Sequence, residues 1–265
     1  MFLGVATLAA PFPVSIGHAD TVPQEANAAD VIFLGEQHDN PAHHAVQAAW
    51  VDYLKPTAVV FEMLTAEQAS LVTADNRIDE AQLEEVLQWN ASGWPDFSMY
   101  YPIFAAAPDA TVLGAAVPRA QLMESMQGEG ADILEAAQAE KFGLTEPLPE
   151  EQQLSRLALQ DAAHCGALPE ELLPRMIEVQ RLRDAVLAKT ALAGFDNLGG
   201  PVVVITGNGH AREDWGAPFL LRQAAPDVHV FSLGQGEAGR MPDGGFEHVA
   251  DGPAVDRGDP CEAFK

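Results

Sequence analysis

The chain is poor in basic residues. Its 265 residues include only 14 Lys and Arg against 39 Asp and Glu, which gives a formal net charge of −25. A surface with this charge repels the phosphates of DNA and RNA and anionic membrane surfaces. We therefore expect no nucleic-acid partner. The acidity itself is explained by the need to stay soluble in salty surroundings.

Cysteine is scarce as well, because Cys165 and Cys261 are the only two in the chain. Their wide separation excludes the closely spaced thiolates of a Cys-based zinc site. Two interpretations stay open. One is a single disulfide that pins the C-terminal tail to the body of the protein, and the other is a pair of unpaired buried thiols.

Long hydrophobic runs are missing from most of the chain, and without about 20 consecutive apolar residues we expect no transmembrane helix. Residues 1–19 nevertheless have the pattern of a secretory signal peptide: an apolar run, then two prolines, then small residues before Asp20. They lack the usual basic start, and no cysteine near the expected cleavage site is available to carry a lipid. We predict a periplasmic or secreted protein without a lipid anchor.

Five short apolar segments alternate with long helical patterns: 31–34, 58–61, 111–117, 202–206 and 228–233. This alternation is typical of βαβ units, so we predict an α/β fold with a largely parallel central sheet flanked by helices. The prediction places this domain at residues 20–236. Residues 121–195 show no strand pattern and are predicted as a helical insertion between the third and fourth strands. Residues 237–265, rich in Gly, Pro and Asp, are predicted as an irregular tail.

The first apolar segment is predicted to lead through a tight polar turn into a helix. Gly35 would allow a sharp exit from the strand, and Asn40 would cap the helix. Pro41 is tolerated at the first helical position because its missing N–H has no partner there. Glu36 and His38 lie between these residues, where the backbone has little freedom.

Two further segments carry polar residues to the same part of the fold. The second strand leads to Glu62, and the fourth leads through Gly-Asn-Gly to His210 and Arg212. Right-handed crossovers bring the carboxyl ends of parallel strands to one edge, where open α/β sheets bind ligands. We therefore predict that Glu36, His38, Glu62 and His210 meet in a single cleft.

Together these motifs resemble a known family. A Gly-Glu-x-His-Asp-Asn sequence precedes a helix that carries His43 and His44. We expect these two histidines on the helix surface or behind the site. Three further motifs follow along the chain: Glu-Met after the second strand, an aromatic segment from Trp94, and Gly-x-Gly-His-Ala-Arg. The set is similar to the ChaN-type haem-binding uptake proteins of the Tiki/TraB and erythromycin-esterase-like superfamily, over residues 31–233. The resemblance implies an envelope protein of haem iron acquisition with site residues Glu36, His38, Glu62, His210 and Arg212.

Haem is the leading predicted ligand. It needs an apolar slot, an axial donor and cations for its propionates. Tyr100 or Tyr101 would supply a phenolate, and His164 or His210 an imidazole. Ordinary core packing is the alternative for the tyrosines. The arginines available for the propionates are Arg119, Arg181, Arg183 and Arg212.

A divalent metal is the second interpretation. Carboxylates and imidazoles together suit Zn, Mn or Fe, and an open coordination position would activate water for hydrolysis. Relatives elsewhere in the superfamily are hydrolases, so the alternative function is a metal-dependent esterase or protease that uses Glu36, His38, Glu62 and His210, with Arg212. A purely structural hydrogen-bond network and a scaffold that has lost its chemistry stay open, as does a homodimer.

Overall fold

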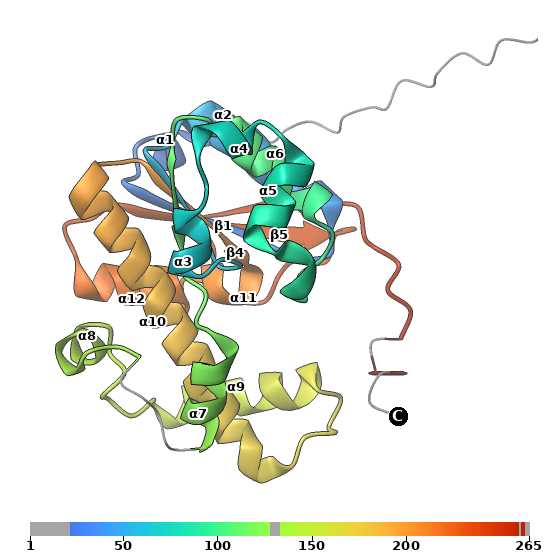
Figure 1. Ribbon diagram of the computed structural model, residues 1–265. Coiled ribbons are helices and arrows are strands. Elements are labelled where there is room, and N and C mark those ends of the chain that lie inside the picture. Colours follow the sequence, from blue (N-terminus) through green and yellow to red (C-terminus); the bar gives the residue numbers. More distant parts are fainter. Residues whose placement is uncertain (1–21, 128–132, 260, 263–265) are drawn as a thin grey trace, which may run out of the picture.

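The central element is a parallel β-sheet, in which the described part of the chain forms six strands in the order β3-β2-β4-β1-β5-β6 (Figure 1). The structure is a computed structural model and describes residues 22–127, 133–259 and 261–262. The predicted signal peptide, residues 1–19, lies outside them. The predicted α/β fold, a parallel sheet flanked by helices, is confirmed. None of the described helices has both the length and the hydropathy that a membrane span requires.

The strands follow the predicted apolar segments, with one addition. They are β1 (Val31–Glu36), β2 (Ala58–Phe61), β3 (Thr111–Gly114), β4 (Val202–Gly207), β5 (Val230–Glu237) and β6 (His248–Gly252). The last strand corrects the prediction of an entirely irregular tail. Because β5 runs on past Gly234 to Glu237, its open edge pairs in parallel with residues 248–252. Only Val249 and Ala250 of this segment are apolar, so its sequence does not have the apolar pattern of a strand.

Side chains of the strands alternate between two hydrophobic layers, as the period of two in a β-strand requires. Leu34 and Phe61 belong to the layer that packs against α2, α5 and α6. Phe33 and Val60 belong to the layer that packs against α10 and α12. The helices on the first side and the long α10 on the other enclose the sheet in a three-layer arrangement (Figure 1).

The helices begin and end as follows. Those before β3 are α1 (Gln24–Asn27), α2 (Pro41–Leu54), α3 (Ala66–Ser70), α4 (Ala74–Arg77), α5 (Glu80–Leu87) and α6 (Phe97–Ala106). Those between β3 and β4 are α7 (Arg119–Gln127), α8 (Ala136–Lys141), α9 (Glu150–Ala163) and α10 (Leu173–Leu198). The remaining ones are α11 (Asn208–Ala211) and α12 (Ala217–Ala224).

The helical region between β3 and β4 extends beyond the sheet. Helices α7 and α9 lie below it in Figure 1, and α10 runs from this lower part up onto the sheet face. Residues Leu182 to Leu192 of α10 belong to the hydrophobic layer under the strands. The region predicted as an insertion therefore forms both a separate wall and, through α10, part of the core.

Helix α2 forms as its local sequence dictates. The side chain of Asn40 accepts a hydrogen bond from the backbone N–H of Ala42 at 3.0 Å, and Pro41 occupies the first helical position. The helix ends at Leu54, followed by Lys55 in the left-handed region (φ 48°) directly before Pro56. The start predicted for this helix is confirmed.

Gly35 has a different role from the one predicted. It lies inside β1, so the strand does not turn there. A Cβ atom at this position would lie 2.5 Å from Asn208 Oδ1 and 2.8 Å from the carbonyl oxygen of Leu233. Glycine is needed because the loop after β4 approaches the strand closely, and Asn208 Oδ1 accepts a hydrogen bond from Gln235 N at 2.9 Å.

The C-terminal tail is tied to the helical region. Cys165, just after α9, and Cys261 form a disulfide. Of the two interpretations that the sequence left open, the single disulfide is therefore the one observed. The bond joins residues 96 positions apart. Disulfides persist mainly in oxidising compartments, which agrees with the export predicted from the first residues.

Replacement of Gly35 by alanine tests the close approach. We expect Gly35→Ala to lower the free energy of unfolding by about 1–3 kcal/mol, because the new methyl group displaces Asn208 or the β5 backbone. Urea unfolding followed by circular dichroism measures the change. Gly209→Ala is the matched control, because a Cβ there meets nothing within 4 Å. Equal destabilisation by the two variants would contradict this account.

Candidate functional site at the carboxyl edge of the sheet

The four predicted acidic and imidazole residues lie at the carboxyl edge of the sheet. Glu36 ends β1, Glu62 follows β2, and His210 lies on the short helix α11 after β4. They form two neighbouring groups, one around Glu36 and one around Glu62. His38 belongs to the first group but is close enough to the second for the charge of Glu62 to act on it.

Glu36 is a buried carboxylate with three polar neighbours. Its Oε1 lies 2.8 Å from His38 Nδ1 and 3.1 Å from the hydroxyl of Tyr100, which donates to it. Its Oε2 lies 3.1 Å from His44 Nδ1, in an electrostatic contact that is not aligned as a hydrogen bond. Burial disfavours the charged carboxylate, but His38 and His44 outweigh this effect and hold the pKa of Glu36 below its ordinary value.

His38 uses one ring nitrogen to bind Glu36, and its other nitrogen, Nε2, lies near Gly207. Because an ionised carboxylate only accepts hydrogen bonds, His38 donates from Nδ1 to Glu36. Its Nε2 makes no hydrogen bond to any residue in the described part of the chain, and the side chain is 34% exposed. The ring packs edge-on against Trp94 at 4.8 Å. Burial lowers the pKa of His38, but the bond to Glu36 outweighs it and raises the pKa above 6.5.

His44 supports this arrangement from the interior. It is buried, and its Nε2 donates to the carbonyl oxygen of His38 at 2.8 Å while Nδ1 faces Glu36. Both nitrogens face acceptors, which favours the imidazolium. The pKa of His44 is accordingly raised, although burial opposes the charge. The neighbouring His43 is buried too, so of the two alternatives for this pair the helix surface is not observed, and His44 lies behind the site.

Glu62 is also buried, and both of its oxygens have donors. Oε2 accepts from the hydroxyl of Thr206 at 2.5 Å and from the N–H of Gly207 at 2.8 Å. Oε1 accepts from Arg183 and lies 3.6 Å from His210 Nε2. Burial raises the pKa of Glu62, but the charges of His210 and Arg183 outweigh it and lower the pKa far below its ordinary value.

Asp184 connects the second group to α10. Its carboxylate lies 2.6 Å from His210 Nδ1, so His210 is held between two carboxylates. Burial raises the pKa of Asp184, against the opposing effect of His210. The sequence shows Asp184 only as part of a charged edge of a helix. No local motif links it to His210, which follows 26 residues later.

This arrangement does not support the predicted metal site. In residues 22–127, 133–259 and 261–262, no group of three or more His, Cys, Asp or Glu is placed to hold a metal ion. Both oxygens of Glu62 are taken by protein donors, and Glu36 is surrounded by His38, His44 and Tyr100. Carboxylates with this many donors have little capacity left for a cation. Nothing here favours a metal-dependent hydrolase.

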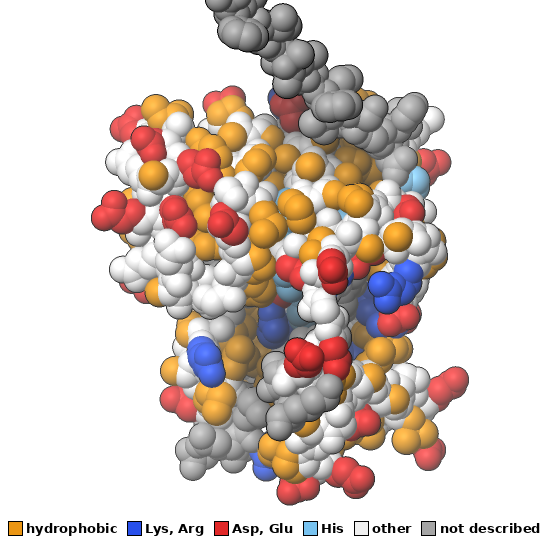
Figure 2. All heavy atoms as spheres, turned by 90° about the vertical axis from the view of Figure 1, so that its right-hand side faces the viewer, with side chains coloured by type: hydrophobic (Ala, Val, Ile, Leu, Met, Phe, Trp, Pro, Cys, Tyr) orange, Lys and Arg blue, Asp and Glu red, His pale blue; other side chains and the backbone are white. Residues whose placement is uncertain are grey.

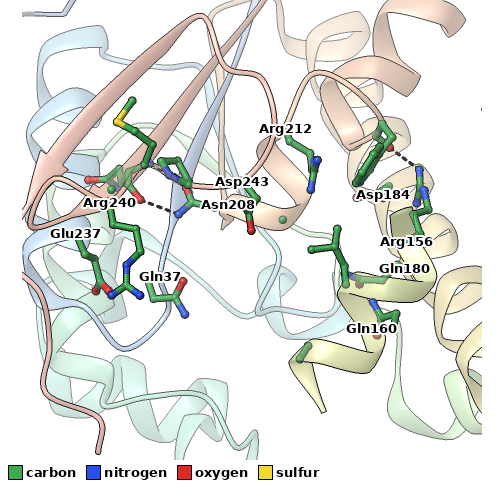
Figure 3. A pocket seen from close by; sticks show the side chains of 18 of the residues that line it. Gln37, Arg156, Gln160, Gln180, Asp184, Asn208, Arg212, Glu237, Arg240 and Asp243 are labelled. Carbon is green, nitrogen blue, oxygen red and sulfur yellow. Dashed lines mark hydrogen bonds between the residues drawn. The ribbon is translucent and has the colours of Figure 1, made fainter. Parts of the chain in front are cut away.

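A cavity of about 550 Å³ opens beside these groups, between the edge of the sheet and helices α9 and α10 (Figure 3). Gln37, which lies between Glu36 and His38, and Asn208, which follows Gly207, line the wall at the sheet edge. Gln160 and Gln180 line the opposite wall. Its volume falls in the range of roughly 300–1,000 Å³ typical of small-ligand sites. Figure 2 shows basic and histidine side chains inside a hollow between the upper and lower parts of the molecule.

The lining of this cavity carries four arginines and three acidic residues, Asp184, Glu237 and Asp243, in a chain where acidic residues far outnumber basic ones. Its four arginines are Arg156, Arg212, Arg240 and Arg257. Arg156 and Arg212 lie over the ring of Trp215, at 5.1 Å and 3.6 Å from its centre. The Nε of Arg156 is buried with no hydrogen-bond partner among the described residues, and Arg240 has no ion pair with them. Arg212, predicted as a site residue, does line the cavity and also pairs with Asp214 at 2.6 Å.

Among the predicted site residues, only Arg212 lines this cavity. Glu36, His38, Glu62 and His210 lie beside it and outside its lining, so the prediction that these four share one cleft is not borne out. The residues predicted to bind a cofactor lie outside the lining as well: Tyr100, Tyr101, His164, Arg119 and Arg183. Tyr100 is buried with its hydroxyl on Glu36, and burial together with that carboxylate raises its pKa. A phenolate at Tyr100 is therefore disfavoured, which argues against this residue as an axial ligand.

The other predicted cofactor residues have diverse surroundings. Tyr101 is half-buried and its ring lies 6.1 Å from that of Phe97. His164 Nδ1 donates to the carbonyl oxygen of Gln160 at the end of α9. Arg183 binds Glu62, and Arg119 is exposed at the start of α7. Their roles in ligand binding stay predictions.

The chain is similar to one known family and to several solved structures. A family model described as "Haem-binding uptake, Tiki superfamily, ChaN" matches residues 22–221. No curated protein gives a significant match. Among solved structures, ChaN of Campylobacter jejuni, described as showing cofacial haem binding, aligns with a TM-score of 0.65 at 20% identity over 82% of this chain and 85% of that one. At this identity, the likeness shows the fold.

Two other solved structures align less well. The type III effector HopBA1 gives a TM-score of 0.45 at 12% identity, covering 85% of this chain and 88% of that one. A mutant of the erythromycin esterase EreC gives 0.46 at 14% identity, covering 83% and 72%. These likenesses are too weak to support an argument about the site.

The charges around Glu36 predict a defined pH dependence. We expect the free energy of unfolding of the wild type to exceed that of Glu36→Gln by about 3 kcal/mol or more between pH 4.5 and 6.5, the ordinary pKa values of Glu and His. The difference shrinks as the pH falls through the lowered pKa of Glu36. It also shrinks as the pH rises through the raised pKa values of His38 and His44.

Urea unfolding of both proteins from pH 4 to pH 9 measures this difference. The control is Glu85→Gln, which changes an exposed glutamate on α5 and leaves the pH profile unchanged. A difference between wild type and Glu36→Gln that stays constant over the whole range would show that the charge of Glu36 is not the stabilising feature.

Proposed function

The chain belongs to the ChaN family of haem-binding uptake proteins in the Tiki superfamily, and on this premise we propose that it binds haem at the carboxyl edge of the sheet, between His38 and the adjoining cavity that Gln37 lines. The single observation that carries the proposal is His38. Its Nδ1 is fixed by a buried carboxylate while Nε2 is left without a hydrogen-bond partner among the described residues.

His38 has the features of an axial ligand. A histidine that binds a metal commonly donates its other ring N–H to a carboxylate, which fixes the ring and increases the basicity of the ligating nitrogen. Glu36 supplies that carboxylate, and Tyr100 and His44 hold Glu36 in place. His210 is less suited, because its two nitrogens face Asp184 and Glu62. Tyr101 is the remaining predicted phenolate donor.

The cavity has the other groups that haem requires. Its basic side chains, with Arg156 and Arg240 not engaged by carboxylates of the described residues, suit the two propionates. Leu159, Ile177 and Met241 add apolar surface for the porphyrin, and Leu159 and Met241 are exposed. Bound haem would supply an iron centre with a coordination position for the imidazole.

We further propose that the protein acts outside the cytoplasm, in the acquisition or handling of haem iron. The pattern of residues 1–19 and the Cys165–Cys261 disulfide both favour an oxidising compartment. The description of the Campylobacter jejuni protein as binding haem cofacially makes a pair of haems an option for this chain.

Titration of the apo-protein with hemin tests the proposal. In the wild type we expect a Soret shift that saturates as hemin is added. In His38→Ala we expect the affinity for hemin to fall about tenfold or more and the Soret maximum to change, because the axial nitrogen is lost. His229→Ala is the matched control, since His229 is exposed at the opposite, amino edge of the sheet, next to Asp30. A loss of the shift in Tyr101→Phe with wild-type behaviour of His38→Ala would assign the iron to the tyrosine instead.

The affinity for hemin should depend on pH through His38. Iron and a proton compete for Nε2, so binding weakens by about tenfold per pH unit once the pH falls below the raised pKa of His38. We expect tighter binding at pH 8 than at pH 6, measured by the same titration in buffers of equal ionic strength. Affinity that does not change over this range would exclude His38 as the ligand.

A further inference from the structure

The C-terminal tail places Arg257 in the lining of the cavity and is attached both to the sheet edge and to the helical region. We propose that residues 253–259 together with 261–262, which we term the strap, act as a gate that limits how fast ligand enters and leaves, with Arg257 as the positioning residue and the Cys165–Cys261 disulfide as the lock. This inference rests on the proposed function for the identity of the ligand, haem.

The first fastening is Arg257, which joins the strap to the sheet edge. Its guanidinium makes two hydrogen bonds of 2.6 Å to Asp39 and bonds of 2.6 Å and 2.7 Å to Glu237. Such fork-shaped pairing fixes orientation as well as position. Arg257 lowers the pKa of Glu237 to about 2. Asp39 directly follows His38, so the strap is held next to the proposed axial ligand.

Asn40 adds a second contact at the same edge. Its side-chain amide donates to the carbonyl oxygen of Pro253 at 2.9 Å and to Glu237 at 2.7 Å. The residue that caps α2 therefore also fixes the beginning of the strap. The cap, the end of β5 and the tail form one hydrogen-bonded unit.

The opposite end of the strap is fastened to the helical wall. Cys261 is bonded to Cys165, which follows α9. Gln160 and Ala163 of α9 line the cavity, as does Arg257 of the strap. The tail, red at the right of Figure 1, descends from the sheet toward the level of α9, on the side that faces the viewer in Figure 2. It thus joins the two walls between which the ligand has to pass.

The two fastenings differ in how they can be released. Arg257 is exposed to competition, because an incoming propionate can take the place of Asp39 or Glu237 at the guanidinium. The disulfide opens only by reduction: a dithiol transfers two electrons and two protons, becomes a disulfide itself, and leaves thiols at Cys165 and Cys261. The strap then loses its covalent attachment to the helical region and keeps its contacts at the sheet edge.

Transfer of haem from the loaded protein to excess apomyoglobin, followed in the Soret region, measures release. We expect Arg257→Ala, and separately the double variant Cys165→Ser with Cys261→Ser, to release haem about tenfold faster than wild type, with an unchanged Soret maximum. Arg222→Ala is the matched control, because Arg222 also joins two carboxylates, Glu213 and Glu247, and does not line the cavity. A rate of haem release within twofold of the wild-type rate in both test variants would contradict the proposal that the strap acts as a gate.

A readout without haem separates this proposal from the previous one. In the apo-proteins, hydrogen exchange of backbone amides in residues 253–259 and 236–243 should become at least about tenfold faster in both test variants and not in Arg222→Ala. If no protein binds hemin, haem binding fails, and the exchange rates still decide whether the strap is fastened as described. Unchanged exchange in both test variants would refute the fastening itself.

Discussion

The buried carboxylate of Glu36 is the constraint on which the site depends. An ionised carboxylate in the interior is costly unless donors surround it, and here His38, His44 and Tyr100 provide them. The same contacts determine the state of each partner: His38 donates from Nδ1, the pKa of His44 is raised, and Tyr100 donates its hydroxyl. The charge of Glu36 therefore fixes the ring of His38, which is more exposed than Glu36, His44 and Tyr100.

The second carboxylate, Glu62, makes the edge of this sheet rigid. Glu62 accepts bonds at both oxygens from the β4 end and from Arg183, and His210 is held between Glu62 and Asp184. Groups engaged in this way join β2, β4 and α10 into one rigid edge. They have little freedom to activate water, but they give the neighbouring cavity a stable wall.

Charge is distributed unevenly over the molecule. The chain carries −25 overall, yet four of its 14 basic residues line a single cavity. A local basic region inside an acidic surface selects for a ligand that is itself a small anion with an apolar body, because larger polyanions are repelled before they reach it. The disulfide-fastened tail completes this enclosure by connecting the sheet edge to the helical wall.

The sequence by itself determined the parallel α/β architecture, helix α2 with its cap, and the strand ends that carry Glu36, Glu62 and His210, because these features follow from local periodicity and backbone preferences. It did not reveal β6, the partnership of Asp184 with His210, the burial of Tyr100, the role of Gly35 or the arginines of the cavity. Each of these depends on contacts between segments far apart in the chain. Local sequence fixes which groups stand at the end of a strand, whereas only packing decides which of them are buried together, which are saturated by donors and which keep a free atom for a ligand.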